Sequence, residues 1–233
     1  FVLLSATHVF SQPPSTQLGN KLVGIGSIPI SQPGFSSAIS ADGKTAVVCG
    51  PSDDNIKGAA WIFVKVGNKW IQEGNKLVGT GSVGNAQQGW STAISADGNT
   101  VAIGGPRDSS STGAVWVFTR SSGVWSQQGN KLVGSGSVGS ANQGSSVALS
   151  ADGNTLVIGG RQDNNIGAVW VFNRGGSTWL QQGAKIVAND YAGNPSFGCS
   201  VSVSADGNTA VIGGSNDNGT GACWIFKRST NVW

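Results

Sequence analysis

The chain has 233 residues, including 37 glycines, nine tryptophans, one histidine and no methionine, and only 11% of its residues are charged. The shortage of good helix formers argues against a helical protein, the 38% hydrophobic content argues against disorder, and a net charge of +3 gives no case for nucleic-acid binding. The composition therefore predicts an all-β protein with many tight turns, and a chain of this length can fold without a metal or a disulfide.

Residues 1–16 form an apolar N-terminal extension that begins with Phe1, Val2, Leu3 and Leu4. The stretch resembles the end of a secretory signal peptide and is too short to span a bilayer. The alternative is a retained apolar strand that pairs with the sheet edge of a neighbouring subunit. Both interpretations predict a protein that is secreted, extracellular or at the cell surface, with no membrane span.

Residues 17–233 form a single domain of four copies of one unit. The tripeptide Ala-Asp-Gly begins at Ala41, Ala96, Ala151 and Ala205, so its spacings are 55, 55 and 54 residues. The motif Gly-Ala-x-Trp-x-Phe, a second tryptophan nine positions after the first, and the motif Gly-x-Lys-Leu/Ile-Val also occur four times. Self-similarity at a fixed period of this length indicates a repeat architecture.

Each unit is predicted to hold four short antiparallel strands, as the second copy illustrates. Strands are expected over Ser91–Ser95, Thr100–Ile103 and Ala114–Phe118, and from Val124 toward Lys131. Asp-Gly-Asn at 97–99 predicts a tight hairpin turn, and the unbroken apolar third strand predicts burial on both faces. Four-stranded units of about 55 residues that bury both faces against their neighbours predict a β-propeller.

The ends of the repeat region predict how the ring closes. Residues 17–23 have the sequence of an outer strand with no other strands before them, and Trp233 stands where the outer strand of the fourth unit begins. We therefore expect this N-terminal strand, with Leu18, Leu22 and Val23, to complete the fourth blade. The completed blade lies in the same chain, in a closed four-blade ring, or in a different molecule, in a chain of subunits.

The units resemble FG-GAP repeats, the blades of the integrin α-chain propeller and of many bacterial surface proteins. The resemblance covers residues 17–233 and rests on Phe197-Gly198 and on the Gly-x-Pro elements that end at Pro51 and Pro106. It implies an extracellular protein of adhesion or protein interaction. The family often has seven blades, where this chain has four copies, and often carries an acidic calcium loop between the first two strands.

One aspartate per copy occupies that turn. These aspartates are Asp42, Asp97, Asp152 and Asp206. A calcium site needs six to eight oxygens, usually several from carboxylates. A single carboxylate per turn favours a plain hairpin turn and no cofactor, with calcium as the alternative.

Catalysis is not expected. The only histidine is His8, in the N-terminal extension, and Glu73 is the only glutamate. The aspartates recur at equivalent repeat positions, which does not suggest one asymmetric active site. Nucleophilic machinery of the Ser-His-Asp or Cys-His kind is therefore absent from the repeats.

A second acidic position recurs between the second and third strands, at the opposite end of each unit. Its residues are Asp53 or Asp54, then Asp108, Asp163 and Asp217, and we take Asp54 in the first copy. A ring of four such loops predicts a multivalent polar face that binds sugars or another protein. The alternative is that each aspartate caps its own turn.

The tryptophans form two series. The inner series, Trp61, Trp116, Trp170 and Trp224, lies in apolar runs and is expected in the core between blades. The outer series, Trp70, Trp125, Trp179 and Trp233, begins the outer strands and supplies candidate carbohydrate contacts. Trp90 alone lies outside both series.

The cysteines and one asparagine lead to two further predictions, on burial and on glycosylation. Cys49, Cys199 and Cys223 match no metal-ligand spacing and are expected as small buried hydrophobic residues, with a Cys199–Cys223 bridge as the alternative. Asn218 begins the only glycosylation sequon.

Three functions remain open. The first is an extracellular propeller for adhesion or interaction with other proteins, which the resemblance implies. The second is the structural subunit of an extracellular filament, in which copies assemble by exchange of the N-terminal strand. The third is a multivalent lectin that binds glycans.

Overall fold

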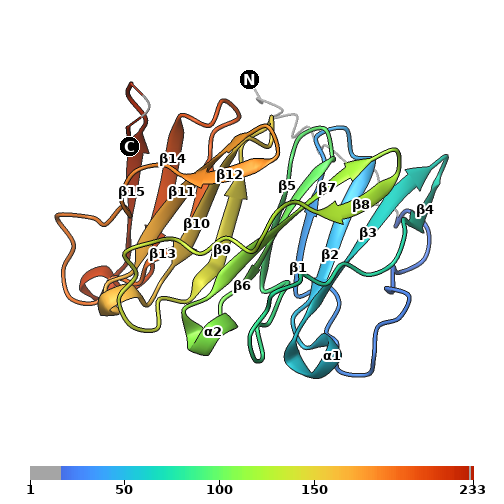
Figure 1. Cartoon of the computed structure of the whole chain (residues 1–233), viewed down its shortest axis with the longest axis horizontal. Coiled ribbons are helices and arrows are strands. Elements are labelled where there is room, and N and C mark those ends of the chain that lie inside the picture. Colours follow the sequence, from blue (N-terminus) through green and yellow to red (C-terminus); the bar gives the residue numbers. More distant parts are fainter. Residues whose placement is uncertain (1–16, 231) are drawn as a thin grey trace, which may run out of the picture.

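The computed structural model describes residues 17–230 and 232–233 as four antiparallel sheets that stand side by side in chain order (Figure 1). We call these sheets blades 1 to 4. Blade 1 holds β1 (Ser36–Ile39), β2 (Thr45–Gly50), β3 (Ala59–Val66) and β4 (Lys69–Gln72). Blade 2 holds β5 (Ser91–Ile94), β6 (Thr100–Gly105), β7 (Ala114–Ser121) and β8 (Val124–Gln127).

Blade 3 holds β9 (Gln143–Leu149), β10 (Thr155–Gly160), β11 (Ala168–Gly175) and β12 (Thr178–Gln181). Blade 4 holds β13 (Phe197–Val203), β14 (Thr209–Gly214) and β15 (Ala222–Lys227). A helical turn separates the second and third strands of every blade: α1 (Asp53–Ile56), α2 (Asp108–Ser111), η1 (Asp163–Asn165) and η2 (Asp217–Gly219). The predicted all-β architecture of repeated antiparallel units is confirmed.

The outer strand is shorter than the sequence predicts. In blade 2 it ends at Gln127, because the chain turns at Gly129, where φ is +73° and the Gln127 side-chain amide donates to the Gly129 carbonyl at 2.8 Å. Leu132 then forms a bridge with Val115 of the third strand. The segment that follows each outer strand therefore continues its own blade before it crosses to the next one.

The core lies between neighbouring blades. Trp116 of blade 2 is fully buried among Val47 and Ile62 of blade 1 and donates its indole N–H to the Thr80 carbonyl at 2.8 Å. Gly79 lies flat on this ring, and a Cβ there would stand 2.0 Å from it, so only glycine fits. Trp170 is equally buried between blades 2 and 3, which with Trp116 confirms the inter-blade core position expected for the inner tryptophans. Trp61 is buried against residues of its own blade and Gly24, and Trp224 is partly buried.

The structure does not show closure of the ring. Residues 17–23 pair with no described strand of blade 4, and Leu18, Lys21 and Leu22 lie instead beside Lys69 and Trp70 of blade 1. The side chains Leu18, Leu22 and Val23, expected to complete a blade, are exposed by 50%, 36% and 55%. Phe1, Val2, Leu3 and Leu4 lie outside the described residues.

Blade 4 presents an open apolar face. Ile225 is 71% exposed and Val211 is 40% exposed, whereas the equivalent Val171 and Val157 of blade 3 are buried against blade 4. This exposure follows from the open arrangement, because no further described sheet covers blade 4.

The three cysteines are free thiols. Cys49 is buried, and its burial raises the pKa of its thiol to about 12, so it is an unreactive core residue. Cys199 is half-buried and Cys223 is exposed, so the prediction of buried cysteines is wrong for Cys223, and the alternative Cys199–Cys223 bridge is not formed.

No helix within residues 17–230 and 232–233 is long and apolar enough to cross a membrane.

Candidate functional site

Each blade has two ends with different chemistry. The end that carries the Ala-Asp-Gly hairpins is called the turn end, and the opposite end, with the helical turns α1, α2, η1 and η2, is called the loop end. In Figure 1 the helical turns α1 and α2 lie along the lower edge of the sheets.

At the turn end, the aspartates complete their own hairpins. Both carboxylate oxygens of Asp97 accept hydrogen bonds, from the Ser95 hydroxyl at 2.5 Å, the Asn99 backbone N–H at 3.0 Å and the Asn99 side-chain amide at 3.0 Å. Burial alone would raise the pKa of Asp97, but these hydrogen bonds outweigh it and hold the pKa below its usual range. The same serine-to-aspartate contact occurs at Asp42, Asp152 and Asp206.

These turns do not fit calcium. Each offers one carboxylate, and hydrogen bonds from the serine and from the residue two positions after the aspartate already occupy it. At Asp206 the hydrogen bonds from Ser204 and Asn208 lower the pKa to about 2. Within the described part of the chain, no group of three acidic, histidine or cysteine residues is placed to hold a metal ion. Calcium needs six to eight oxygen ligands, which one committed carboxylate does not supply.

At the loop end, the recurring aspartates of blades 1 to 3 are buried ion-pair partners. The Asp108 carboxylate is completely buried, pairs with the Lys131 ammonium group and accepts the Val83 backbone N–H at 2.7 Å. Lys76–Asp53 and Lys185–Asp163 are the equivalent pairs. The equivalent residue in blade 1 is thus Asp53, and Asp54, which we chose from the sequence, is exposed.

Two of the aspartates predicted to line a binding face are therefore used inside the fold. Asp108 and Asp163 hold the chain that crosses between blades, so they do not project from the surface as ligands. Asp217 of blade 4 accepts the Ala192 backbone N–H at 2.7 Å. Asn218, the sequon asparagine, lies beside it on exposed η2.

The outer tryptophans join neighbouring blades. The Trp125 indole N–H donates to the Glu73 carboxylate of blade 1 at 2.7 Å, and the Arg120 guanidinium lies 5.3 Å from the centre of the Trp125 ring. Trp179 makes the same two contacts with Gln128 and Arg174. Trp233 makes them with Gln182 and Arg228. An arginine thus covers one face of each of these three rings, and Trp70 alone in the outer series has no such arginine among the described contacts.

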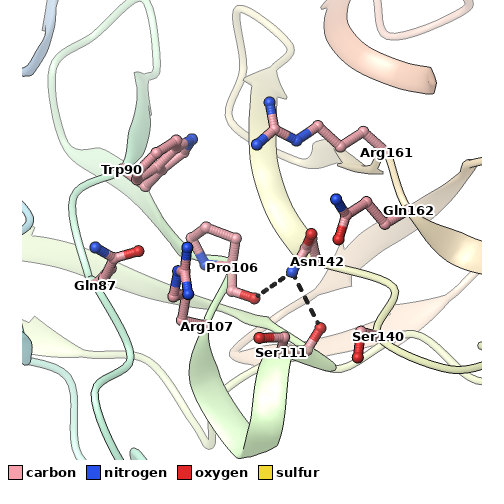
Figure 2. A pocket seen from close by; sticks show the side chains of 9 residues that line it. All are labelled: Gln87, Trp90, Pro106, Arg107, Ser111, Ser140, Asn142, Arg161 and Gln162. Atoms are coloured by element: carbon pink, nitrogen blue, oxygen red, sulfur yellow. Dashed lines mark hydrogen bonds between the residues drawn. The ribbon is translucent and has the colours of Figure 1, made fainter.

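A pocket of about 210 Å³ opens at the loop end between blades 2 and 3 (Figure 2). We call it the inter-blade pocket. Its wall includes Trp90, Arg107 and Gln87 from the blade 2 side and Asn142, Arg161 and Gln162 from the blade 3 side.

Local backbone geometry places these side chains. Gln87 and Asn142 precede the first strands of blades 2 and 3 and have φ of +57° and +56°, a left-handed conformation that turns the chain into the strand. Asn142 is fixed by its side-chain amide, which donates to the carbonyls of Pro106 at 3.2 Å and Ser111 at 3.3 Å (Figure 2).

The polar groups of the pocket are not neutralised by the protein. Within residues 17–230 and 232–233, neither Arg107 nor Arg161 takes part in a salt bridge. The side-chain oxygen of Gln87 is buried and accepts no hydrogen bond. Arg107 and Arg161 are exposed, so an anion can reach their guanidinium groups. The buried oxygen of Gln87 costs free energy as long as it has no partner.

Trp90 gives the pocket its aromatic wall. Its ring packs on Phe35 of blade 1, with 4.9 Å between ring centroids and an interplanar angle of 48°. Sequence reasoning set Trp90 apart from the two tryptophan series but assigned it no role. The signal that could have found the pocket is the departure of Trp90, Arg107 and Arg161 from the residues at equivalent positions of the other copies.

Comparisons with known proteins support the fold. Residues 179–226 match the family model of the FG-GAP repeat. A candidate 6-phosphogluconolactonase from Bacteroides uniformis is 15% identical with a TM-score of 0.56, and the match covers 84% of this chain and 50% of that one. The hydrazine synthase of Kuenenia stuttgartiensis is 15% identical with a TM-score of 0.54, and the match covers 83% and 58%.

TolB from Acinetobacter baumannii is 12% identical with a TM-score of 0.48, over 84% of this chain and 41% of that one. This chain thus spans about half the length of these solved structures. No curated protein matches the chain. Four repeats, their antiparallel sheets, the FG-GAP match and the two structures with TM-scores above 0.5 lead to one conclusion: the chain carries an FG-GAP repeat on a β-propeller-like fold.

Proposed function

We propose that this chain is a non-catalytic, extracellular binding propeller that acts in adhesion or interaction through the loop end of its blades and needs no cofactor. The observation that carries the proposal is the inter-blade pocket, whose lining holds two arginines without a salt bridge among the described residues, the unsatisfied oxygen of Gln87 and the half-buried Trp90. The FG-GAP repeat supports an extracellular interaction role, because such repeats are typical of extracellular proteins.

The aspartates that recur in the copies also support binding at the inter-blade pocket, because the fold already uses their carboxylates. The turn-end aspartates accept hydrogen bonds within their own hairpins, and the loop-end aspartates of blades 1 to 3 pair with lysines. Their hydrogen-bonding capacity is used within the fold. The residues that remain for a partner are those at which one copy differs from the next.

A binding array tests this function. Immobilised acidic peptides, neutral glycans and acidic glycans are probed with the wild-type chain and with the double variant Arg107→Ala/Arg161→Ala. We expect the wild type to retain at least one ligand class that the double variant loses. The control Lys65→Ala/Lys69→Ala removes the same charge from exposed positions outside the pocket and should bind like the wild type. Wild-type binding to none of the classes would contradict the proposal.

Lactone hydrolysis is the competing activity, because one similar structure is a candidate 6-phosphogluconolactonase. That similarity, at 15% identity, concerns the fold alone. We expect no acceleration of 6-phosphogluconolactone hydrolysis above a heat-denatured sample. Turnover that is lost in the Arg107→Ala/Arg161→Ala variant would replace the binding function with catalysis at the same pocket.

A second candidate function is self-assembly, as a structural subunit, through the open face of blade 4. In blades 1 to 3 a lysine after the outer strand pairs with the loop-end aspartate, and the next residue bridges the third strand, as Leu132 does with Val115. Lys21-Leu22 has the same motif, while Asp217 of blade 4 has no lysine partner among the described ion pairs. The N-terminal segment of one copy therefore fits blade 4 of a second copy.

Charge reversal tests this assembly. Light scattering across a concentration series should show association of the wild type, dissociation of Lys21→Asp and of Asp217→Lys, and restored association of the double variant. Asp54→Lys changes an exposed aspartate elsewhere and serves as the control. A wild type that stays monomeric at every concentration would remove this candidate function.

A further inference from the structure

We propose that the ligand of the inter-blade pocket is a hexuronate, a sugar ring that carries a carboxylate. This inference rests on the proposed binding function and names the ligand class for it. Four properties of the pocket lead to it: its size, its charge, its unsatisfied acceptor and its aromatic wall.

The size selects a single small unit. The pocket measures about 210 Å³, below the roughly 300–1,000 Å³ of pockets that bury a drug-sized molecule. One hexose ring or one amino-acid side chain is the scale of ligand that such a volume accepts. The pocket therefore recognises one unit of a chain or one free molecule.

The charge selects an anion. Arg107 and Arg161 belong to different blades and stand on opposite sides of the pocket, each without a carboxylate partner among the described residues (Figure 2). Guanidinium groups match carboxylates in two-point hydrogen bonds, which are stronger than neutral ones. An anionic group that enters the pocket is attracted by both arginines.

The unsatisfied acceptor selects a ligand that also donates. The side-chain oxygen of Gln87 is enclosed in the pocket wall without a partner, so a ligand O–H or N–H group satisfies it once the amide turns toward the pocket. A carboxylate side chain of a peptide offers only acceptors at the end that enters the pocket. A hexuronate carries ring hydroxyls within one ring of its carboxylate, so a single unit meets both requirements.

The aromatic wall selects a ligand with an apolar face. The Trp90 ring is held by Phe35 at 4.9 Å and is half-buried, which leaves part of its face at the pocket. One face of a pyranose ring presents C–H groups that pack on an indole, while its hydroxyls point outward to amides such as Gln162. Inorganic anions and small carboxylates lack such a face.

Isothermal titration calorimetry of the full chain tests the ligand class. The probes are methyl glucuronide, an oligogalacturonate, the neutral methyl glucoside, propionate and an acidic peptide. We expect both uronates to bind, and methyl glucoside and propionate to bind at least about tenfold more weakly, because each lacks one of the two recognition elements. The comparison of methyl glucuronide with the oligomer distinguishes a free sugar acid from a unit of a polysaccharide.

Variants connect the binding to the pocket. Arg107→Ala and Arg161→Ala should each weaken glucuronide binding about tenfold or more. Gln87→Met keeps the side-chain size and removes the acceptor, so it should weaken the glucuronide more than propionate. Lys65→Ala/Lys69→Ala is the matched charge control, and unchanged thermal melting shows that each variant is folded.

The outcomes separate the two proposals. Equal affinity for methyl glucoside and methyl glucuronide overturns the hexuronate. Arginine-dependent binding of the acidic peptide without binding of either uronate also overturns it, but leaves the proposed binding function intact. No binding of any probe here or on the array overturns both.

Discussion

The turn end and the loop end of the blades are built by the same repeat, yet they differ in how far the copies agree. At the turn end, every copy has the same aspartate hydrogen-bonded to a serine two residues earlier, and the hairpins of neighbouring blades are joined by backbone bonds such as Ala96 N–H to the Ala151 carbonyl at 2.9 Å. At the loop end, blades 2 and 3 carry Trp90, Arg107 and Arg161 where other copies have different residues. The shared residues stabilise the scaffold, and the differing ones line the pocket.

The largest expected effect separates a scaffold tryptophan from the pocket tryptophan. Trp116→Ala should lower the free energy of unfolding by about 3–5 kcal/mol, because it removes a fully buried ring and leaves a cavity. Trp90→Ala, at a half-buried ring, should cost much less stability and abolish uronate binding. Denaturant unfolding of both variants measures this difference. Equal destabilisation would place Trp90 in the scaffold.

The next largest effect is the difference in stability loss between substitutions of two adjacent aspartates of α1, Asp53 and Asp54. Asp53→Ala should cost about 3 kcal/mol, because it leaves the Lys76 ammonium group without its buried partner. Asp54→Asn, at an exposed position whose left-handed backbone (φ +48°) asparagine also tolerates, should change stability by less than about 0.5 kcal/mol. The same unfolding experiment measures both values. A larger effect at Asp54 would contradict the assignment of Asp53 as the structural residue.

Acid should weaken the turn end. The pKa of Asp42, Asp97, Asp152 and Asp206 is lowered in the folded chain, to about 2 at Asp206, by hydrogen bonds to their carboxylates. These bonds therefore stabilise the fold above the ordinary aspartate pKa of about 3.9, and the stabilisation is lost as the pH falls toward 2. Thermal midpoints should change little from about pH 7 to pH 5 and fall below about pH 4. Asp97→Asn/Asp152→Asn/Asp206→Asn should show a smaller fall, and an identical fall would assign the acid sensitivity elsewhere.

The smallest expected effect is that of a metal chelator. Because each turn-end carboxylate is occupied by its own hairpin, the thermal midpoint should be the same with excess calcium and with chelator. A higher midpoint in calcium, lost in Asp152→Asn, would show a calcium site at the turn end after all.

The sequence predicted the fold well because the evidence was local and repeated. The Asp-Gly turn and the apolar third strand with its tryptophan each occur once per copy, so the four copies support one another. The end of the outer strand at Gln127 was missed, because the turn at Gly129 and the bridge from Leu132 to Val115 depend on the neighbouring strand.

The candidate site was predicted less well, for two physical reasons. The loop-end aspartates looked like surface residues, although a lysine follows each of them by 22 or 23 positions in blades 1 to 3, a spacing that could have revealed the buried pairs. The pocket joins Arg107 and Arg161 from two blades at positions that are not equivalent in the repeat. Only the packing of the blades brings them together.

The most direct test of the binding account is a titration of the nitrogen-15-labelled chain with methyl glucuronide, followed by NMR. The indole N–H signal of Trp90 and the side-chain amide signal of Gln87 should shift together and saturate. The side-chain amide signals of Asn99 and Asn154, at the turn end, should stay in place. Shifts confined to the turn end or to Trp125 and Trp179, with Trp90 unchanged, would contradict the account.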